Sequence, residues 1–175
     1  MPDEIQPDEL PLEAELSESA EGTEPLEERL PEQQFCVFRA GRERFCLAVL
    51  DVEEVVYWPM VTRVPLAPPY LLGVFNLRGT IVPLVDIAFT EGRRHGLLPK
   101  QVVVASLPGE GNHDDLRLGI AADEVIGTYV VTDLSLLEQA PENVPHCYGL
   151  LRHDDRLALA LDLRRIVEVF PMPVI

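Results

Sequence analysis

The sequence has few cysteines, little positive charge and no long apolar run, and each shortage excludes a class of protein. Its three cysteines form no C-x-x-C pair and have no metal-ligand spacing, which favours small apolar strand residues in a reducing compartment. The longest apolar stretches are interrupted by Arg78, Pro83 and Asp86 well before the ~18 residues that a membrane span needs. No basic segment followed by an apolar one opens the chain, so no secretory signal is expected. We therefore expect a soluble cytoplasmic protein with no direct membrane insertion.

Positive charge is scarce throughout the chain. Fourteen Lys and Arg residues stand against 30 Asp and Glu, a net charge of -16, and no basic cluster offers a surface for nucleic acid. Residues 1–33 alone contain twelve acidic side chains and a single basic one, Arg29. Such a segment cannot bury enough apolar surface to offset its ordering entropy, which predicts a disordered acidic arm. The spacing of Leu10, Leu12 and Leu16 leaves open a short helix that forms on a partner.

The rest of the chain resembles itself. Shifted by 76 positions without a gap, GVFNLRGTIVPLVDI (73–87) matches GLLRHDDRLALALDL (149–163). Gly73 then aligns with Gly149, and Asp86 with Asp162. Two shorter matches occur in the same order, QFCVF with QVVVA and VEEVV with ADEVI. Two copies of about 70 residues are therefore expected.

Each copy has the pattern of β-strands. The apolar runs are of strand length and are separated by turn residues, while Pro59, Pro65, Pro68 and Pro69 exclude a long helix between them. The expected strands are 34–39 and 44–49, joined by the turn 40–43, and 82–87, 102–107, 116–121 and 156–163. A barrel of about 70 residues is marginal alone, so we expect two that pack together and leave a cleft between them.

Several motifs resemble one known family. G-V-F-N-L-R-G-T-I-V-P-L-V-D-I, together with V-E-E-V-V, L-G-I-A-A-D-E-V and L-A-L-D-L, is similar to the CheW adaptor domain of bacterial chemotaxis arrays, over about residues 34–168. The resemblance implies an all-β fold of two packed five-stranded SH3-like barrels after the acidic arm. We expect a CheW-like domain over 34–170, with barrel cores at 34–88 and 101–163 and possible strand exchange between them. The C-terminal helix of many members is expected to be absent or reduced to 164–170.

The resemblance also implies a function. Family members are non-enzymatic adaptors that couple chemoreceptors to a CheA-type histidine kinase in a signalling array at the membrane. A groove between the barrels receives the receptor tip, and the outer barrel ends contact the regulatory domain of the kinase. A CheW-like scaffold of a related pathway, such as type IV pilus twitching or surface sensing, is the alternative. No cofactor is implied.

The candidate site residues fall into two groups. The first group is expected to bind partners: Val52, Glu54 and Arg78 match family positions associated with binding, Asn76 belongs to the same signature, and Val49, Leu72, Ile120 and Val125 are candidates for the apolar groove floor or for ordinary core. The second group is expected to be structural, and it consists of Gly73, Gly79, Pro83, Asp86, Gly149 and Asp162.

Arg78 has three possible roles. Catalysis is least supported, because no Ser, Cys or His stands nearby in the sequence as nucleophile or base. An internal ion pair with Glu53, Glu54 or Asp86 and a contact with a partner are both open. We hypothesise that Glu54 and Arg78 pair across neighbouring strands at the groove edge, with Gly79 permitting the turn. Arg78→Ala is then expected to weaken array assembly by ~2 kcal/mol or more, with little change in thermal stability.

Other polar and aromatic residues suggest no chemistry. His113-Asp114-Asp115 and His153-Asp154-Asp155 are expected to be exposed turns and not metal sites. Asp86 and Asp162 end strands in separate barrels, so they are not expected to converge on a catalytic site. Trp58 is expected to be a buried plug rather than an exposed anchor. The sequence thus predicts neither a catalytic residue nor a metal site.

Overall fold

The computed structural model describes residues 33–90, 93–94, 98–109, 115–131, 138–153 and 156–171. The acidic arm lies outside these residues. The strands are β1 (Gln33–Ala40), β2 (Glu43–Ala48), β3 (Val52–Tyr57), β4 (Leu71–Leu77), β5 (Thr80–Val85), β6 (Phe89–Thr90), β7 (Arg93–Arg94), β8 (Gln101–Leu107), β9 (Leu116–Ala122), β10 (Glu124–Val131), β11 (Glu138–Gln139), β12 (Cys147–His153) and β13 (Arg156–Leu161). The 3-10 helix η1 (Val49–Asp51) follows β2, and the helix α1 (Leu163–Val169) follows β13.

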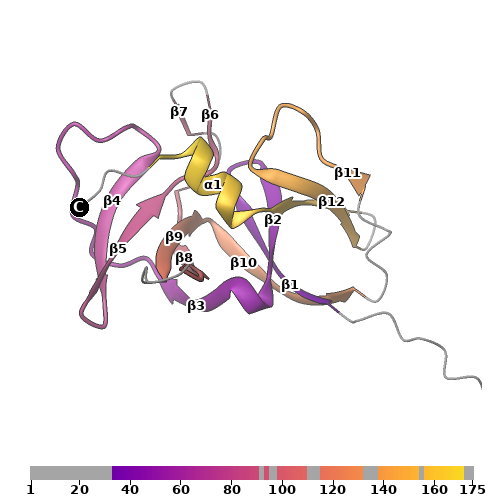
Figure 1. Cartoon of the computed structure of the whole chain (residues 1–175), viewed down its shortest axis with the longest axis horizontal. Helices are drawn as coiled ribbons and strands as arrows, with labels where there is room; N and C mark the ends of the chain where they lie inside the picture. The colour runs from indigo at the N-terminus through magenta and orange to yellow at the C-terminus, as the bar shows by residue number, and fades with distance from the viewer. Residues whose placement is uncertain are drawn as a thin grey trace, which may run out of the picture.

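The long strands form two sheets (Figure 1). Sheet A has the order β10-β1-β2-β13-β12, extended by the two-residue β11, and sheet B has the order β3-β8-β9-β5-β4. The prediction of an all-β fold with two five-stranded units is confirmed. The short helix predicted over 164–170 is present as α1, displaced by one residue.

The internal repeat is confirmed by strand pairing. In the β4–β5 hairpin Leu77 pairs with Thr80, and in the β12–β13 hairpin His153 pairs with Arg156, again 76 residues later. Both hairpins also contain an irregularity at the same place, next to Gly73 in one and next to Gly149 in the other. Strand pairing corrects the alignment of VEEVV with ADEVI by three residues. The bulge that begins at Val52 in β3 corresponds to the bulge that begins at Val125 in β10. The two halves therefore fold alike.

Each sheet nevertheless contains strands from both sequence repeats. Sheet A takes β1 and β2 from the first repeat and β10, β12 and β13 from the second, whereas sheet B takes β3, β4 and β5 from the first and β8 and β9 from the second. The equivalent strands stand in the same order in the two sheets. Along the chain, all strands of sheet B thus lie in one segment, from β3 to β9, between the two parts that form sheet A.

Three apolar clusters hold the sheets together. Because successive strand residues point to opposite faces, Val103 of β8 enters a core shared by both sheets, while Val102 and Val104 enter a core enclosed by sheet B alone. Sheet A encloses its own core in the same way. Helix α1 lies over the junction of the sheets and contributes Ile166 to the shared core (Figure 1). The expected cleft between the two units is therefore largely filled by side chains.

The two edges of sheet B approach each other without pairing as strands. Within the described residues β3 and β4 form no ladder, but Thr62, which follows β3, exchanges two backbone hydrogen bonds of 2.8 Å with Val74 of β4. Gly73 makes this approach possible, because a Cβ at this position would lie 2.3 Å from the Thr62 carbonyl oxygen. Its φ of 144° also disfavours a side chain. The barrel expected around this core is thus tied at one point rather than closed by a continuous ladder.

Candidate functional site

The site begins at the tight turn between β4 and β5. Arg78 and Gly79 both have positive φ, 50° and 91°, as a two-residue type I′ hairpin turn requires. The Gly79 backbone N–H donates a 2.7 Å hydrogen bond to Oδ1 of Asn76, which fixes the turn. Asn76, a predicted partner residue, thus has a local structural contact. Gly79 stands where a turn glycine was predicted.

Arg78 pairs with Glu54, as hypothesised. Its Nη2 donates to Oε2 of Glu54 over 3.0 Å, and 79% of the arginine side chain is exposed, against 21% for Glu54. One part of the hypothesis is wrong: β3 and the β4–β5 hairpin are not neighbouring strands but the opposite edges of sheet B. The pair is a second link between these edges, beside the contact of Thr62 with Val74. It is also too exposed to behave as a buried ion pair.

A second ion pair lies beside the first, and sequence reasoning missed it. Nε of Arg117 in β9 donates to Oε2 of Glu53 over 2.7 Å, and its Nη1 donates to the Thr80 hydroxyl over 3.2 Å. Glu53 and Glu54 are thus both engaged by arginines at the same end of sheet B. Only the sheet order could have placed Arg117 here, because it lies 64 residues from Glu53.

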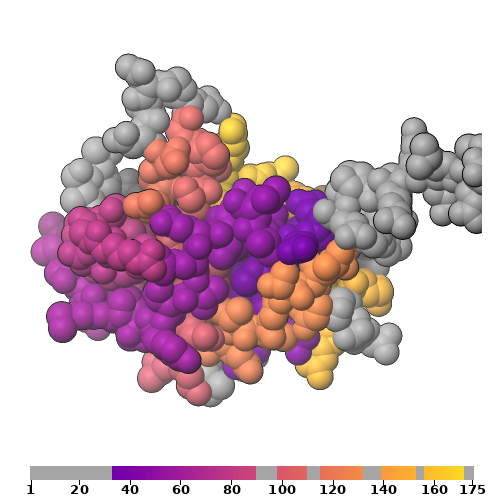
Figure 2. Space-filling view, turned by 90° about the horizontal axis from the view of Figure 1, so that it is seen from below, coloured from indigo at the N-terminus to yellow at the C-terminus, as the bar shows by residue number. Residues whose placement is uncertain are grey.

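The predicted groove residues differ in accessibility. Val49, Val52 and Val125 are half-buried, and Val52 and Val125 pack against the shared core. Leu72 is half-buried against the core of sheet B. Ile120 is fully buried in the shared core, so it offers no surface to a docked partner, and its assignment to a groove floor is replaced by a core role. Figure 2 shows the face to which the β3 segment, in violet, and the β10 segment, in orange, both contribute.

The two matched aspartates hold backbone groups. Asp162 is the N-cap of α1, and its Oδ1 accepts hydrogen bonds from the backbone N–H groups of Arg164 and Arg165. Oδ1 of the buried Asp86 accepts from the Ala88 N–H over 3.1 Å. These contacts are structural and lie in two different places, as the repeat predicts.

Pro83 and Gly149 also have structural positions. Pro83 pairs with Val74, whose N–H and carbonyl are directed to Thr62 and not to β5, so the missing proline N–H costs no hydrogen bond to β4. Gly149 is buried at the irregularity of β12, opposite Ala160.

A buried carboxylate that the sequence did not reveal joins the two sheets. Asp123 is the single residue between β9 and β10. Its Oδ2 accepts 3.0 Å hydrogen bonds from Nη1 of Arg39 and from the Gly41 backbone N–H, and its own N–H donates to the Arg39 carbonyl. These contacts compensate the buried charge and fix the crossing from sheet B to sheet A.

The remaining candidates have the following positions. Cys36, Cys46 and Cys147 are free and buried, and burial raises the pKa of Cys46 and of Cys147 to about 12, so both thiols are neutral. Trp58 is 40% exposed, so it is not the fully buried plug that was expected. His113, Asp114, Asp154 and Asp155 lie outside the described residues. Within the described part of the chain, no three His, Cys, Asp or Glu side chains gather as metal ligands.

Comparison with known proteins decides the family. A family model described as CheW-like domain matches residues 34–170. The chain belongs to the CheW-like domain family. It is 30% identical over 138 residues to the chemotaxis protein CheW of Helicobacter pylori, which covers 77% of this chain and 81% of that protein. It is 31% identical over 119 residues to Protein PilI of Pseudomonas aeruginosa, which covers 64% and 65%.

The fold of this CheW-family chain is also found among solved structures. The scaffolding protein TtCheW from Thermoanaerobacter tengcongensis superposes with a TM-score of 0.65 at 24% identity, over 76% of this chain and 86% of that one. Among the described residues of this CheW-like domain, no helix has the length and apolar character needed to cross a membrane.

Proposed function

We propose that this CheW-family chain is a non-enzymatic adaptor that couples chemoreceptors to a CheA-type histidine kinase in a chemotaxis-like array. The proposal rests on Arg78, which is exposed at the β4–β5 turn in a left-handed backbone conformation. A non-glycine residue with left-handed φ costs roughly 1–2 kcal/mol, and an exposed ion pair returns about 0–1 kcal/mol. Arg78 therefore contributes little to folding, whereas a partner that covers it gains a compensated, charge-assisted contact with a guanidinium that Glu54 already orients.

The surroundings of the pair suit a docked helix. Val49 and Val52 lie on the same segment as Glu54 and are partly exposed, and Val125 is partly exposed on β10. Apolar side chains beside a charged pair are typical of protein contacts, in which the arginine stem packs and its head group hydrogen-bonds. We place the receptor tip on this face, with Arg78, Glu54 and Asn76 at its border. The outer ends of the two sheets are left for the regulatory domain of the kinase.

The adaptor acts in this proposal by position alone. It holds receptor and kinase in one geometry, so that a small movement of the receptor biases the kinase between two states. The proposed location is the cytoplasm, at membrane-associated receptor arrays. The net charge of -16 argues against nucleic acid as a partner.

Co-sedimentation with receptor signalling fragments and kinase tests the proposal. Arg78→Ala is expected to weaken recruitment about 30-fold, which corresponds to ~2 kcal/mol, while the melting temperature changes by less than about 3 °C. Arg156→Ala is the matched control, because Arg156 is exposed at the equivalent hairpin of sheet A, in the position of Thr80. This variant should bind like the wild type.

Two results would contradict this assignment. Unchanged recruitment of Arg78→Ala, together with a large drop in melting temperature, would make Arg78 purely structural. Equal losses in Arg78→Ala and Arg156→Ala would mean that general surface charge is measured, and not a specific site.

A CheW-like scaffold of a related pathway, such as type IV pilus twitching, is the second candidate. It is favoured by the similarity to Protein PilI, whose 31% identity is comparable to the 30% identity to a CheW protein. A pull-down from the native cell separates the candidates by the receptor and kinase that are recovered. Deleting residues 1–30 in the same assay tests the acidic arm, and unchanged binding would identify it as a passive tail.

A further inference from the structure

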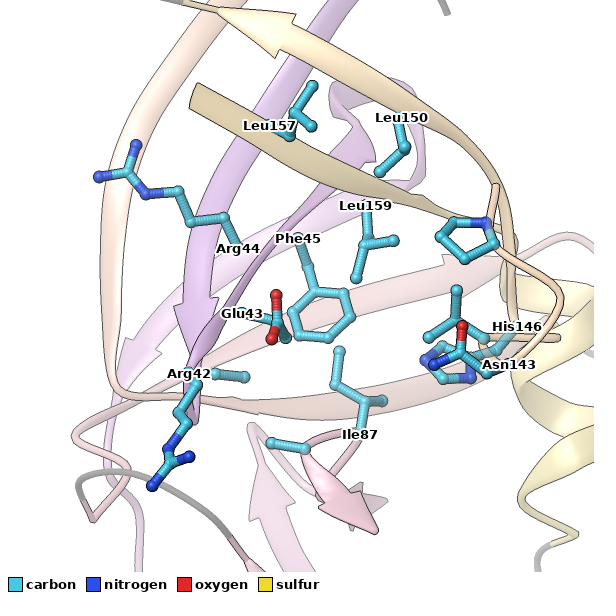
Figure 3. A pocket seen from close by; sticks show the side chains of 14 residues that line it. Arg42, Glu43, Arg44, Phe45, Ile87, Asn143, His146, Leu150, Leu157 and Leu159 are labelled. Atoms are coloured by element: carbon cyan, nitrogen blue, oxygen red, sulfur yellow. The ribbon is translucent and has the colours of Figure 1, made fainter. Parts of the chain in front are cut away.

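A pocket of about 550 Å³ lies beside the core that both sheets share and has no lining residue in common with the predicted partner-binding set (Figure 3). It is open to the surface and is lined by the start of β2, by β12 and β13, by the segment 141–146 and by Ile87 and Ala88. Its walls are mostly apolar: Phe45, Ile87, Leu150, Leu157 and Leu159 surround the space. Its size and apolar lining fall in the range of pockets that bind small organic molecules.

His146 is the most buried of the polar side chains that line this pocket. His146 is only 7% exposed, lines the pocket beside Asn143, and has no hydrogen-bond partner within the described residues at either Nδ1 or Nε2 (Figure 3). Burial lowers the pKa of His146 below its ordinary value of 6.5, so the ring is neutral and presents one N–H donor and one acceptor nitrogen. Both nitrogens are covered by protein atoms, and a buried polar group without a partner is costly, so a ligand toward which the ring turns would supply the missing hydrogen bond.

The internal repeat supplies a comparison within the same molecule. Tyr70 is the equivalent of His146: the Asp86 N–H donates to the Tyr70 carbonyl, as the Asp162 N–H donates to that of His146. Both rings pack against Phe170, with centroid distances of 5.1 and 5.5 Å. The Tyr70 hydroxyl donates to the carbonyl of Pro171 over 3.0 Å, so its polar atom is satisfied. Of these two equivalent side chains, Tyr70 has a hydrogen-bond partner, whereas His146, which lines the pocket, has none within the described residues.

We propose that this pocket binds a small, neutral aromatic molecule whose single N–H or O–H group hydrogen-bonds to His146. The apolar walls accept the ring, and Phe45, 6.3 Å from the His146 ring by centroids, offers an aromatic contact. The charged residues of the lining, Arg42, Glu43 and Arg44, belong to the β1–β2 turn and the start of β2, away from His146 in Figure 3, so the part of the pocket next to His146 selects for a neutral group. This inference is independent of the adaptor function.

Indole and indene are suitable probes, because they have nearly the same shape and only indole carries an N–H donor. Titration of the full chain by calorimetry, with His146 ring shifts followed by NMR, should show indole binding about 5- to 10-fold tighter than indene, the contribution of one neutral hydrogen bond. In His146→Phe the preference should disappear. His146→Gln, which keeps a donor and an acceptor, should restore part of it.

Tyr70→Phe is the matched control, because it removes a polar atom at the equivalent position outside the pocket, and it should keep the preference for indole. The proposal is overturned if indole and indene bind equally, if neither binds, or if His146→Phe keeps the preference. It is also overturned if indole leaves the His146 ring shifts unchanged, which would indicate that water alone satisfies the imidazole.

Discussion

The turn that presents Arg78 allows folding and partner binding to be separated by one substitution. A type I′ turn prefers Asn followed by Gly, and Gly79 is already in place. Arg78→Asn should therefore relieve the left-handed strain, which is roughly 1–2 kcal/mol, and remove the exposed pair with Glu54, worth about 0–1 kcal/mol. The expected net change in the free energy of unfolding lies between zero and a gain of about 2 kcal/mol.

Arg78→Ala provides the contrast. Alanine keeps the φ of 50°, and with it the strain, but loses the ion pair, so the free energy of unfolding should fall by up to about 1 kcal/mol. Both variants should lose partner recruitment equally, because both lack the guanidinium. The expected order of stability is thus Asn, then Arg, then Ala, while the order of binding places Arg alone at the top.

Urea unfolding followed by the fluorescence of Trp58, the single tryptophan, measures this order. A double-mutant cycle with Glu54→Gln isolates the coupling of the pair, which should be below about 1 kcal/mol. A loss of 2 kcal/mol or more in Arg78→Asn would refute the reasoning, since it would mean that the link between the edges of sheet B is a major source of stability.

Three further predictions concern the scaffold. Gly73→Ala should lower the free energy of unfolding by more than about 2 kcal/mol in urea titrations, because its Cβ meets the Thr62 backbone; a loss below 1 kcal/mol would contradict this close approach. Asp162→Ala should cost about 1 kcal/mol in the same assay through loss of the α1 N-cap, and Asp162→Asn, which can still cap, should cost less. The lowered pKa of His146 means that the unfolded chain binds more protons below pH 6.5, so stability should fall as the pH drops through that value. Melting temperatures of His146→Phe should fall less over the same range, and identical pH profiles would show that His146 does not titrate as inferred.

Much of the fold was predictable because the information is local. The hairpin β1–β2, the strands β8 and β9 and the matched pair of hairpins follow from apolar runs, turn residues and a repeat of constant offset. The exchange of strands between the sheets was not predictable in detail. It depends on parallel contacts of β2 with β13 and of β9 with β5, which join residues far apart in the chain and leave no spacing signal.

The site was predictable to the same extent. The turn at Arg78 and Gly79 and the partnership with Glu54 follow from residue types in a short motif and from charge compensation. Arg117 and His146 were missed, since a single strand arginine and a histidine before an apolar run have no distinctive local pattern. Their importance arises only from what the sheet order places next to them.

The two covalent crossings between the sheets restrict how they can move. Sheet A connects to sheet B through the three residues of η1, and sheet B returns to sheet A through Asp123 alone. These two short connections define a single axis about which the sheets could rotate. The ion pair of Arg39 with Asp123 fixes one end of this axis. Any rotation would also shear the core that both sheets share. A displacement imposed on one sheet should therefore be transmitted almost fully to the other, so that the two sheets move as one rigid body and not as two independent units.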